Sequence, residues 1–206
     1  MGQLEKSRKR RSDGERSRNA ILREAVQLAT VEGIDGLSIA RLADAVGMSK
    51  SGLFAHFGSK EELQLATIDT AAASFTEEVV GPALAASTAL ARLRGLGENF
   101  LRYVEEDAFA GGCFFASVAA EMDTHPGPVR DRAVEFTQDW FHLFEATVRA
   151  AQEESAIDPS EDPTQLAFEL DAYLLLGNAQ FVATRDRTAL ERARRALDRR
   201  LTAASA

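Results

Sequence analysis

The stretch between Ser38 and Lys60 constrains the fold of this chain more than any other. Apolar residues recur there with the i, i+3, i+4, i+7 spacing of one helix face: Ile39, Leu42, Ala43 and Val46. Gly47 then ends this helix, because glycine easily adopts a left-handed backbone. Ser49 can cap a second helix. Two short helices joined by a tight turn predict a helix-turn-helix, whose second helix enters the major groove of DNA.

The residues that follow strengthen this interpretation. Ser59 and Glu62 have the spacing of a capping box, so a further helix is expected to begin at Lys60. Three short helices of an ordinary core would give a similar pattern, since generic helix-turn-helix patterns also arise by chance. The full string favours DNA binding, because it resembles the DNA-binding signature of the tetracycline-repressor (TetR) family of bacterial regulators. It reads Gly47-Met48-Ser49, Leu53-Phe54-Ala55-His56-Phe57 and Ser59-Lys60-Glu61-Glu62-Leu63.

The distribution of charge agrees with a DNA-binding part and a separate acidic part. The net charge is −8, but residues 1–60 hold 11 Lys and Arg against 7 Asp and Glu, a balance of +4. The remaining residues hold 13 basic and 25 acidic side chains, a balance of −12. Positive charge is therefore concentrated where DNA phosphates would be met.

The resemblance implies three parts. Residues 1–15 are expected to form a basic flexible arm that is either solvated or follows the DNA, residues 16–62 a helix-turn-helix domain, and residues 63–206 a ligand-binding and dimerisation domain. No alternating strand pattern occurs, so the chain is expected to be all-α, with three N-terminal helices followed by a helical bundle. The fourth helix should run from Lys60 until Gly81-Pro82 breaks it, connecting the two domains.

By resemblance, the recognition helix spans Lys50 to Phe57. The residues expected at the DNA are Ser38, Ser49, Lys50, Ser51, Gly52, Phe54, Ala55, His56 and Lys60. Lys50 can reach guanine O6 and N7, or it can contact a phosphate without reading sequence. His56 is expected at a phosphate, with a packing role as the alternative. The family usually has Tyr at the position of Phe54, so this chain lacks a hydroxyl for a phosphate contact there.

Nothing after residue 62 resembles a catalytic or metal-binding constellation. The three histidines are far apart in sequence, and Cys113 is the single cysteine. We therefore expect no enzyme activity, no metal and no cofactor. Bulky apolar residues are in excess, and the resemblance implies an effector cavity among them, with a dry core as the alternative. The candidate lining residues are Tyr103, Val104, Phe114, Met122, Phe136, Trp140 and Phe144. This face carries no basic cluster, so the effector should be mostly apolar.

Residues 172–182 are apolar on nearly every side, so part of this helix should meet a second copy of the chain. The expected interface, a four-helix arrangement across a two-fold axis, contains Leu174, Gly177, Phe181, Leu190, Leu197 and Leu201. The resemblance then implies a homodimeric repressor that a small-molecule effector releases from a palindromic operator. An effector-independent DNA-binding protein and a helical-bundle enzyme are the alternatives.

The expected location is the cytoplasm. No apolar run approaches the ~20 residues of a membrane span, and the N-terminus is charged rather than apolar. A single cysteine also fits a reducing compartment.

Overall fold

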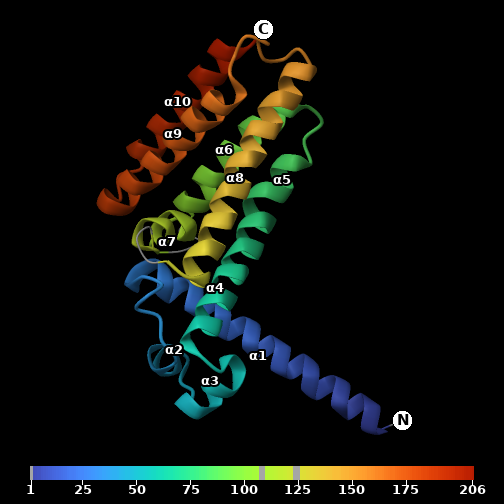
Figure 1. Ribbon diagram of the computed structural model, residues 1–206, viewed down its shortest axis with the longest axis vertical. Coiled ribbons are helices and arrows are strands. Elements are labelled where there is room, and N and C mark those ends of the chain that lie inside the picture. The colour runs from blue at the N-terminus through green and yellow to red at the C-terminus, as the bar shows by residue number, and fades with distance from the viewer. Residues whose placement is uncertain (1, 107–109, 123–125) are drawn as a thin grey trace.

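The computed structural model describes the backbone of residues 2–16 and the complete residues 17–106, 110–122 and 126–206. Within these ranges the chain is helical and contains no strand, which confirms the all-α prediction (Figure 1). The helices are α1 (Gly2–Glu32), α2 (Ile39–Val46), α3 (Lys50–Phe57), α4 (Lys60–Phe75), the π-helical turn η1 (Thr76–Val80), α5 (Gly81–Leu84), α6 (Ala89–Glu105), α7 (Phe114–Met122), α8 (Pro128–Glu153), α9 (Pro163–Thr184) and α10 (Thr188–Ala204).

Helices α1, α2, α3 and the start of α4 enclose a small hydrophobic core of their own. Its buried residues are Ile21, Leu22, Ala25, Leu37, Leu42, Ala43, Leu53, Phe57 and Leu63. The local signals in the sequence act as expected, because Ser38, Ser49 and Ser59 cap α2, α3 and α4, each accepting a bond from a backbone N–H three residues on. Gly47 ends α2 with a φ of 67°, in the left-handed region. The predicted helix-turn-helix is therefore present.

Helix α1 begins at Gly2, not at Arg16, and its first half projects away from the rest of the molecule (Figure 1). This differs from the flexible arm expected over residues 1–15, of which Met1 lies outside the described part of the chain. The physical reason is that the run contains no proline and is rich in Arg, Lys, Glu and Gln, which have high helix propensity. Low apolar content shows that the segment has no core to join, but it does not exclude a helix that continues from a packed one.

Helix α4 connects the two parts of the molecule, as predicted. Leu63 belongs to the small core around the helix-turn-helix, whereas Ile68, Ala71 and Phe75 belong to the large core of the C-terminal bundle. The expected break at Gly81-Pro82 is wrong, since the chain stays helical through η1 and α5 to Leu84. Pro82 has no N–H and would clash with the carbonyl four residues before it in a regular α-helix, which accounts for the wider π turn.

The C-terminal bundle consists of α4 to α10. Helix α8 packs against α4, α6, α7 and α9, and α10 packs against α9 and α6. Figure 1 shows α9 and α10 side by side along one flank of the bundle, far from the helix-turn-helix. Helix α7 lies at the lower end of the bundle, where it also packs against α1. The bundle is thus joined to the DNA-binding part through both α4 and α7.

Candidate DNA-binding surface and effector cavity

Helix α3 presents one face to solvent, on which polar and apolar side chains are mixed. It is held from behind by Leu53 and Phe57, which are buried. The residues predicted to meet DNA are placed on its other sides: Lys50, Ser51, Phe54 and Ala55 are exposed, and Gly52 and His56 are half-buried. Phe54 has 56% of its surface exposed, although it is a large apolar side chain. The face of α3 is therefore free to enter a groove, and contact with DNA stays a prediction for each of these residues.

Three of the residues predicted to contact the DNA backbone lie outside α3, and the side chain of each already has a hydrogen-bond partner within the protein. The Ser38 hydroxyl accepts a bond from the Arg41 N–H, and the Ser49 hydroxyl accepts one from the Gly52 N–H at 3.1 Å. The Lys60 ammonium donates to the backbone oxygen and to the carboxylate of Asp35, at 2.6 and 2.8 Å. A serine hydroxyl can still donate its own hydrogen while it accepts. Lys60, however, would have to share its charge between Asp35 and a phosphate.

A carboxylate at the end of α7 holds the loop that precedes α2. The two oxygens of Glu121 accept bonds from the backbone N–H groups of Ile34 and Asp35, at 2.7 and 2.8 Å. A Cβ on Gly33 would lie 2.7 Å from this carboxylate, and its φ is +82°, so glycine is required there. The Gln64 side chain of α4 donates to the Ile34 carbonyl at 2.7 Å. The sequence signal for this contact was Gly33 alone, because Glu121 lies 86 and 87 residues away from its partners.

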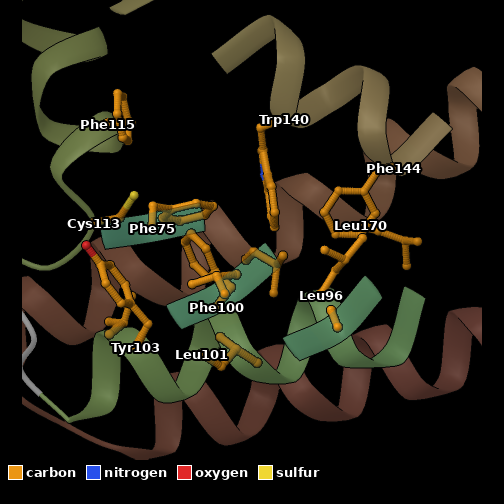
Figure 2. Close-up of a cluster of buried hydrophobic side chains, with 14 of the residues drawn as sticks. Phe75, Leu96, Phe100, Leu101, Tyr103, Cys113, Phe115, Trp140, Phe144 and Leu170 are labelled. Carbon is orange, nitrogen blue, oxygen red and sulfur yellow. The ribbon is translucent and has the colours of Figure 1, made fainter. Parts of the chain in front are cut away.

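A cavity of about 570 Å³ lies in the bundle between α4, α6, α7, α8 and α9. Its apolar wall includes five aromatic rings, those of Phe75, Phe100, Phe115, Phe136 and Trp140. The rings of Phe115 and Phe136 are stacked with centroids 3.5 Å apart, and the Trp140 ring meets Phe75 edge-on at 5.0 Å. In Figure 2, Trp140 points from α8 toward Phe75 and Phe100, and Phe144 lies beside Leu170. This size and lining suit a small, largely apolar molecule.

Of the seven predicted lining residues, the structure brings only Phe136 and Trp140 to the cavity. Tyr103, Val104, Phe114 and Phe144 are buried in the surrounding core, and Met122 packs partly buried against it. Burial raises the pKa of the Tyr103 hydroxyl above its ordinary value. The apolar pattern identified the correct region of the bundle, but it could not separate the wall of a cavity from the core behind it.

The polar groups of the cavity were missed by the sequence analysis. The Trp140 indole N–H donates to the Asp171 carboxylate at 2.9 Å, and burial raises the pKa of this carboxyl. The Asn178 side-chain oxygen accepts a bond from the Cys113 N–H at 2.9 Å. Burial also raises the pKa of the Cys113 thiol, to about 11, so it stays protonated at neutral pH. In the sequence, the signal that could have identified these polar groups was the presence of Asp171 and Asn178 in a mostly apolar stretch of α9.

The residues predicted for the dimer interface lie inside a single chain. All six are buried within one copy: Leu174, Gly177, Phe181, Leu190, Leu197 and Leu201. A Cβ on Gly177 would lie 2.8 Å from that of Ala193 on α10, so this glycine allows α9 and α10 to approach each other. Side chains that are buried within one copy leave little surface for a partner, so contact with a second copy stays a prediction for these six residues. A helix that is apolar on all sides has two faces to bury, and its sequence does not show which face the chain itself covers.

The other face of α9 is apolar and open to solvent. Phe168, Leu175 and Leu176 are exposed at 61%, 41% and 59%, and Ala172 and Ala179 are exposed between them. We call these five residues the α9 outer face. Leu175 and Ala179 also line the cavity. Large apolar side chains gathered on one exposed helix face are typical of a protein interface.

Within the described ranges, no group of three or more His, Cys, Asp and Glu side chains could hold a metal ion. No helix among these residues is long and apolar enough to cross a bilayer.

Comparison with known proteins identifies both parts of the chain. The family model described as the C-terminal domain of tetracyclin repressor-like proteins matches residues 89–197, more than half of the chain. The model described as bacterial regulatory proteins of the tetR family matches residues 21–67. The HTH-type transcriptional repressor AcnR of Corynebacterium efficiens is 40% identical over 63 residues, which are 31% of this chain and 34% of that repressor. The chain thus matches about a third of the length of this curated relative.

Solved structures agree over almost the whole chain. A TetR transcriptional regulator from Chloroflexus aurantiacus is 25% identical, with a TM-score of 0.87 over 94% of this chain and 98% of that one. AibR, whose structure is a complex with isovaleryl coenzyme A and operator DNA, is 24% identical, with a TM-score of 0.70 over 86% of this chain and 94% of that one. With the helix-turn-helix, the bundle and both family models in agreement, the chain belongs to the tetracycline-repressor family of bacterial regulatory proteins.

Proposed function

We propose that this protein is a transcriptional repressor that binds a palindromic operator and is released by a small, mostly apolar effector. The single observation that carries the proposal is that α4 belongs to both sites. Lys60 stands at its N-terminus beside the recognition helix, and Phe75 at its other end lines the cavity. An effector that displaces Phe75 therefore moves the helix on which α3 rests. The relatives support this role, since AcnR is a repressor and the AibR structure contains both an acyl-coenzyme A and operator DNA.

Release requires that the effector bind the released conformation more tightly than the DNA-bound one. The two sites are then coupled by a free energy, typically of about 1–3 kcal/mol, and DNA weakens effector binding by the same factor. The structure offers two routes for this coupling, because α4 and α7 both line the cavity and both contact the helix-turn-helix part. An effector-independent DNA-binding protein would show no such reciprocity.

We further propose that two copies of the chain pair through the α9 outer face. A two-fold axis at this face would bring Phe168, Leu175 and Leu176 of both copies together and remove them from water. The same axis would direct two α3 helices toward two half-sites, which is why the operator is expected to be palindromic. The first half of α1, which contains the basic residues of the N-terminal segment, would then lie alongside the bound DNA. Such a repressor would act in the bacterial cytoplasm, where its operator is.

The test begins with selection of bound duplexes from a random library, followed by measurement of affinity by fluorescence anisotropy. The selected sites are expected to be two-fold symmetric. Lys50→Ala should change the preferred bases, whereas Arg149→Ala, an exposed cation of α8, should change nothing. Apolar compounds are then titrated while Trp140 fluorescence and release of the labelled operator are followed together. Absence of any selected site would refute DNA-binding regulation. Selected sites that no cavity-binding compound affects would favour the effector-independent alternative.

A further inference from the structure

The cavity contains one formally charged side chain among the described residues that line it, and this charge is negative. Asp171 is the one carboxylic acid among these lining residues, and none of them is Lys, Arg or His. Arg185 is not one of the lining residues, and its guanidinium bonds to the Ala110 carbonyl and lies over the Phe181 ring. An anionic effector would therefore find no described cation on the cavity wall, and its charge would be repelled by Asp171.

The negative charge of Asp171 is not required by the contacts that this side chain makes within the protein. Its hydrogen-bond partner in the described part of the protein is the Trp140 indole, which bonds to Oδ1 at 2.9 Å, and no described cation pairs with it. A neutral asparagine oxygen would accept this bond equally well. A carboxylate costs more to bury than an amide, because it loses more hydration, and this loss is what raises its pKa. Orientation of Trp140 therefore does not account for the charge.

The aromatic walls of the cavity add a second feature, besides the carboxylate, that favours binding of a cation. Five aromatic rings line the cavity together with Asp171, and one of them, Trp140, donates its indole N–H to this carboxylate. Aromatic faces attract cations electrostatically, most strongly when both are removed from water. Aromatic rings also pack against the apolar part of a ligand and remove it from water. A molecule that is bulky, apolar and positively charged would satisfy the whole lining at once.

On these grounds we propose that the effector is a hydrophobic organic cation, whose ammonium or phosphonium charge pairs with Asp171 and whose apolar body packs against the aromatic walls. This inference rests on the proposed function, in that the cavity is taken to be the effector site. It narrows that function to one class of ligand. It also separates this protein from AibR, because coenzyme A thioesters carry phosphates that need cationic partners.

The test uses probes of matched shape and opposite charge. Tetraphenylphosphonium and tetraphenylborate are nearly identical in size, and naphthylmethylammonium and naphthylacetate form a smaller pair. Binding to the full-length protein is measured by calorimetry. The cation of at least one pair is expected to bind at least tenfold more tightly than its anion. Asp171→Asn, which keeps an acceptor for Trp140, should abolish this preference and weaken cation binding at least tenfold. Asp139→Asn, the same change at an exposed residue of α8, should leave the preference intact.

The possible outcomes separate this inference from the proposed function. Equal binding of both members of each pair, tighter binding of the anions, binding of neither cation, or an Asp171→Asn variant that keeps the preference would each overturn it. The fold of Asp171→Asn is checked by its circular dichroism and by its affinity for the selected operator, both of which should be unchanged. A protein that binds its operator but shows no preference for cations remains a regulator with a different effector. A protein that binds no operator refutes the regulator, whatever its cavity holds.

Discussion

The contact between Glu121 and the loop before α2 allows the coupling between the cavity and the DNA-binding part to be tested at one residue. Helix α7 lines the cavity with Phe115, Ala116, Ser117 and Ala119, and its last turn carries Glu121. The Glu121 carboxylate accepts two backbone N–H groups from the part of the chain that leads into the helix-turn-helix. A movement of α7 caused by an effector must therefore pull on this loop or break these bonds. Glu121→Gln is the perturbation of choice, because it keeps the shape of the side chain.

The magnitude follows from the two bonds. Glutamine keeps one acceptor oxygen but places its amide N–H₂ against the other backbone donor, so one bond is lost and two donors face each other. A hydrogen bond to a charged group contributes about 1.5–3 kcal/mol, and Ile34 is buried whereas Asp35 is exposed. We therefore expect Glu121→Gln to lower the free energy of unfolding by about 2 kcal/mol. If α7 is a main route of coupling, a loss of this size corresponds to about a thirtyfold reduction of the effect of an effector on operator affinity.

Two measurements check this prediction. Urea denaturation gives the stability of the wild type, of Glu121→Gln and of Glu153→Gln, a matched change at an exposed residue near the end of α8. Anisotropy of labelled operator, with and without saturating tetraphenylphosphonium, gives the coupling. Glu153→Gln should match the wild type in both assays. The reasoning is refuted if Glu121→Gln is as stable as the wild type and responds equally to the probe. Lost stability with an unchanged response would confine Glu121 to a structural role and leave α4 as the route.

Three further predictions concern the bundle. Leu176→Arg on the α9 outer face should give a folded monomer in sedimentation velocity, whereas Leu174→Arg, two residues away but buried, should give unfolded or insoluble protein. A folded, dimeric Leu176→Arg would place the interface elsewhere. Phe144→Ala should cost about 3–5 kcal/mol of stability, measured by denaturation, because this ring is fully buried and does not line the cavity. Asp171→Asn should stabilise the ligand-free protein at pH 7, since the raised folded-state pKa of Asp171 means that stability is lost as pH rises through it. This gain should disappear below the ordinary value near 3.8, and a gain that is the same at pH 3 and pH 7 would contradict the assignment.

Local signals account for what the sequence predicted well. The serines that cap α2, α3 and α4 and the glycine that ends α2 act within one turn of chain, so the helix-turn-helix can be predicted without knowledge of the rest. The position of α4 as a connection followed from its expected length, which is greater than a helix-turn-helix alone requires. The start of α1 was mispredicted because low apolar content was equated with disorder, although the segment has no proline and more than half of its residues are Lys, Arg, Glu, Gln or Leu, which favour helix.

The features that sequence reasoning missed depend on contacts between distant residues. Asp171 and Trp140 lie 31 residues apart, and Glu121 and Ile34 lie 87 apart, so neither pair has a spacing to recognise. The apolar residues of α9 illustrate the same difficulty at one helix. Leu174 and Leu176 are equally apolar, yet Leu174 is buried in the core of the bundle and Leu176 is exposed to water. Only the packing of the neighbouring helices decides between them.

Leu175 has a consequence for how this regulator can acquire new specificity. It lines the cavity on one side, and on the other it belongs to the α9 outer face, where the second copy is proposed to bind. A substitution at Leu175 that suits a new effector therefore also alters the surface on which pairing depends. Residues of α7 and α8 such as Ala116 and Thr137 line the cavity without lying on that surface. We expect natural variation in effector preference to accumulate on the α7 and α8 walls, while the α9 wall stays constrained by the proposed pairing of two copies.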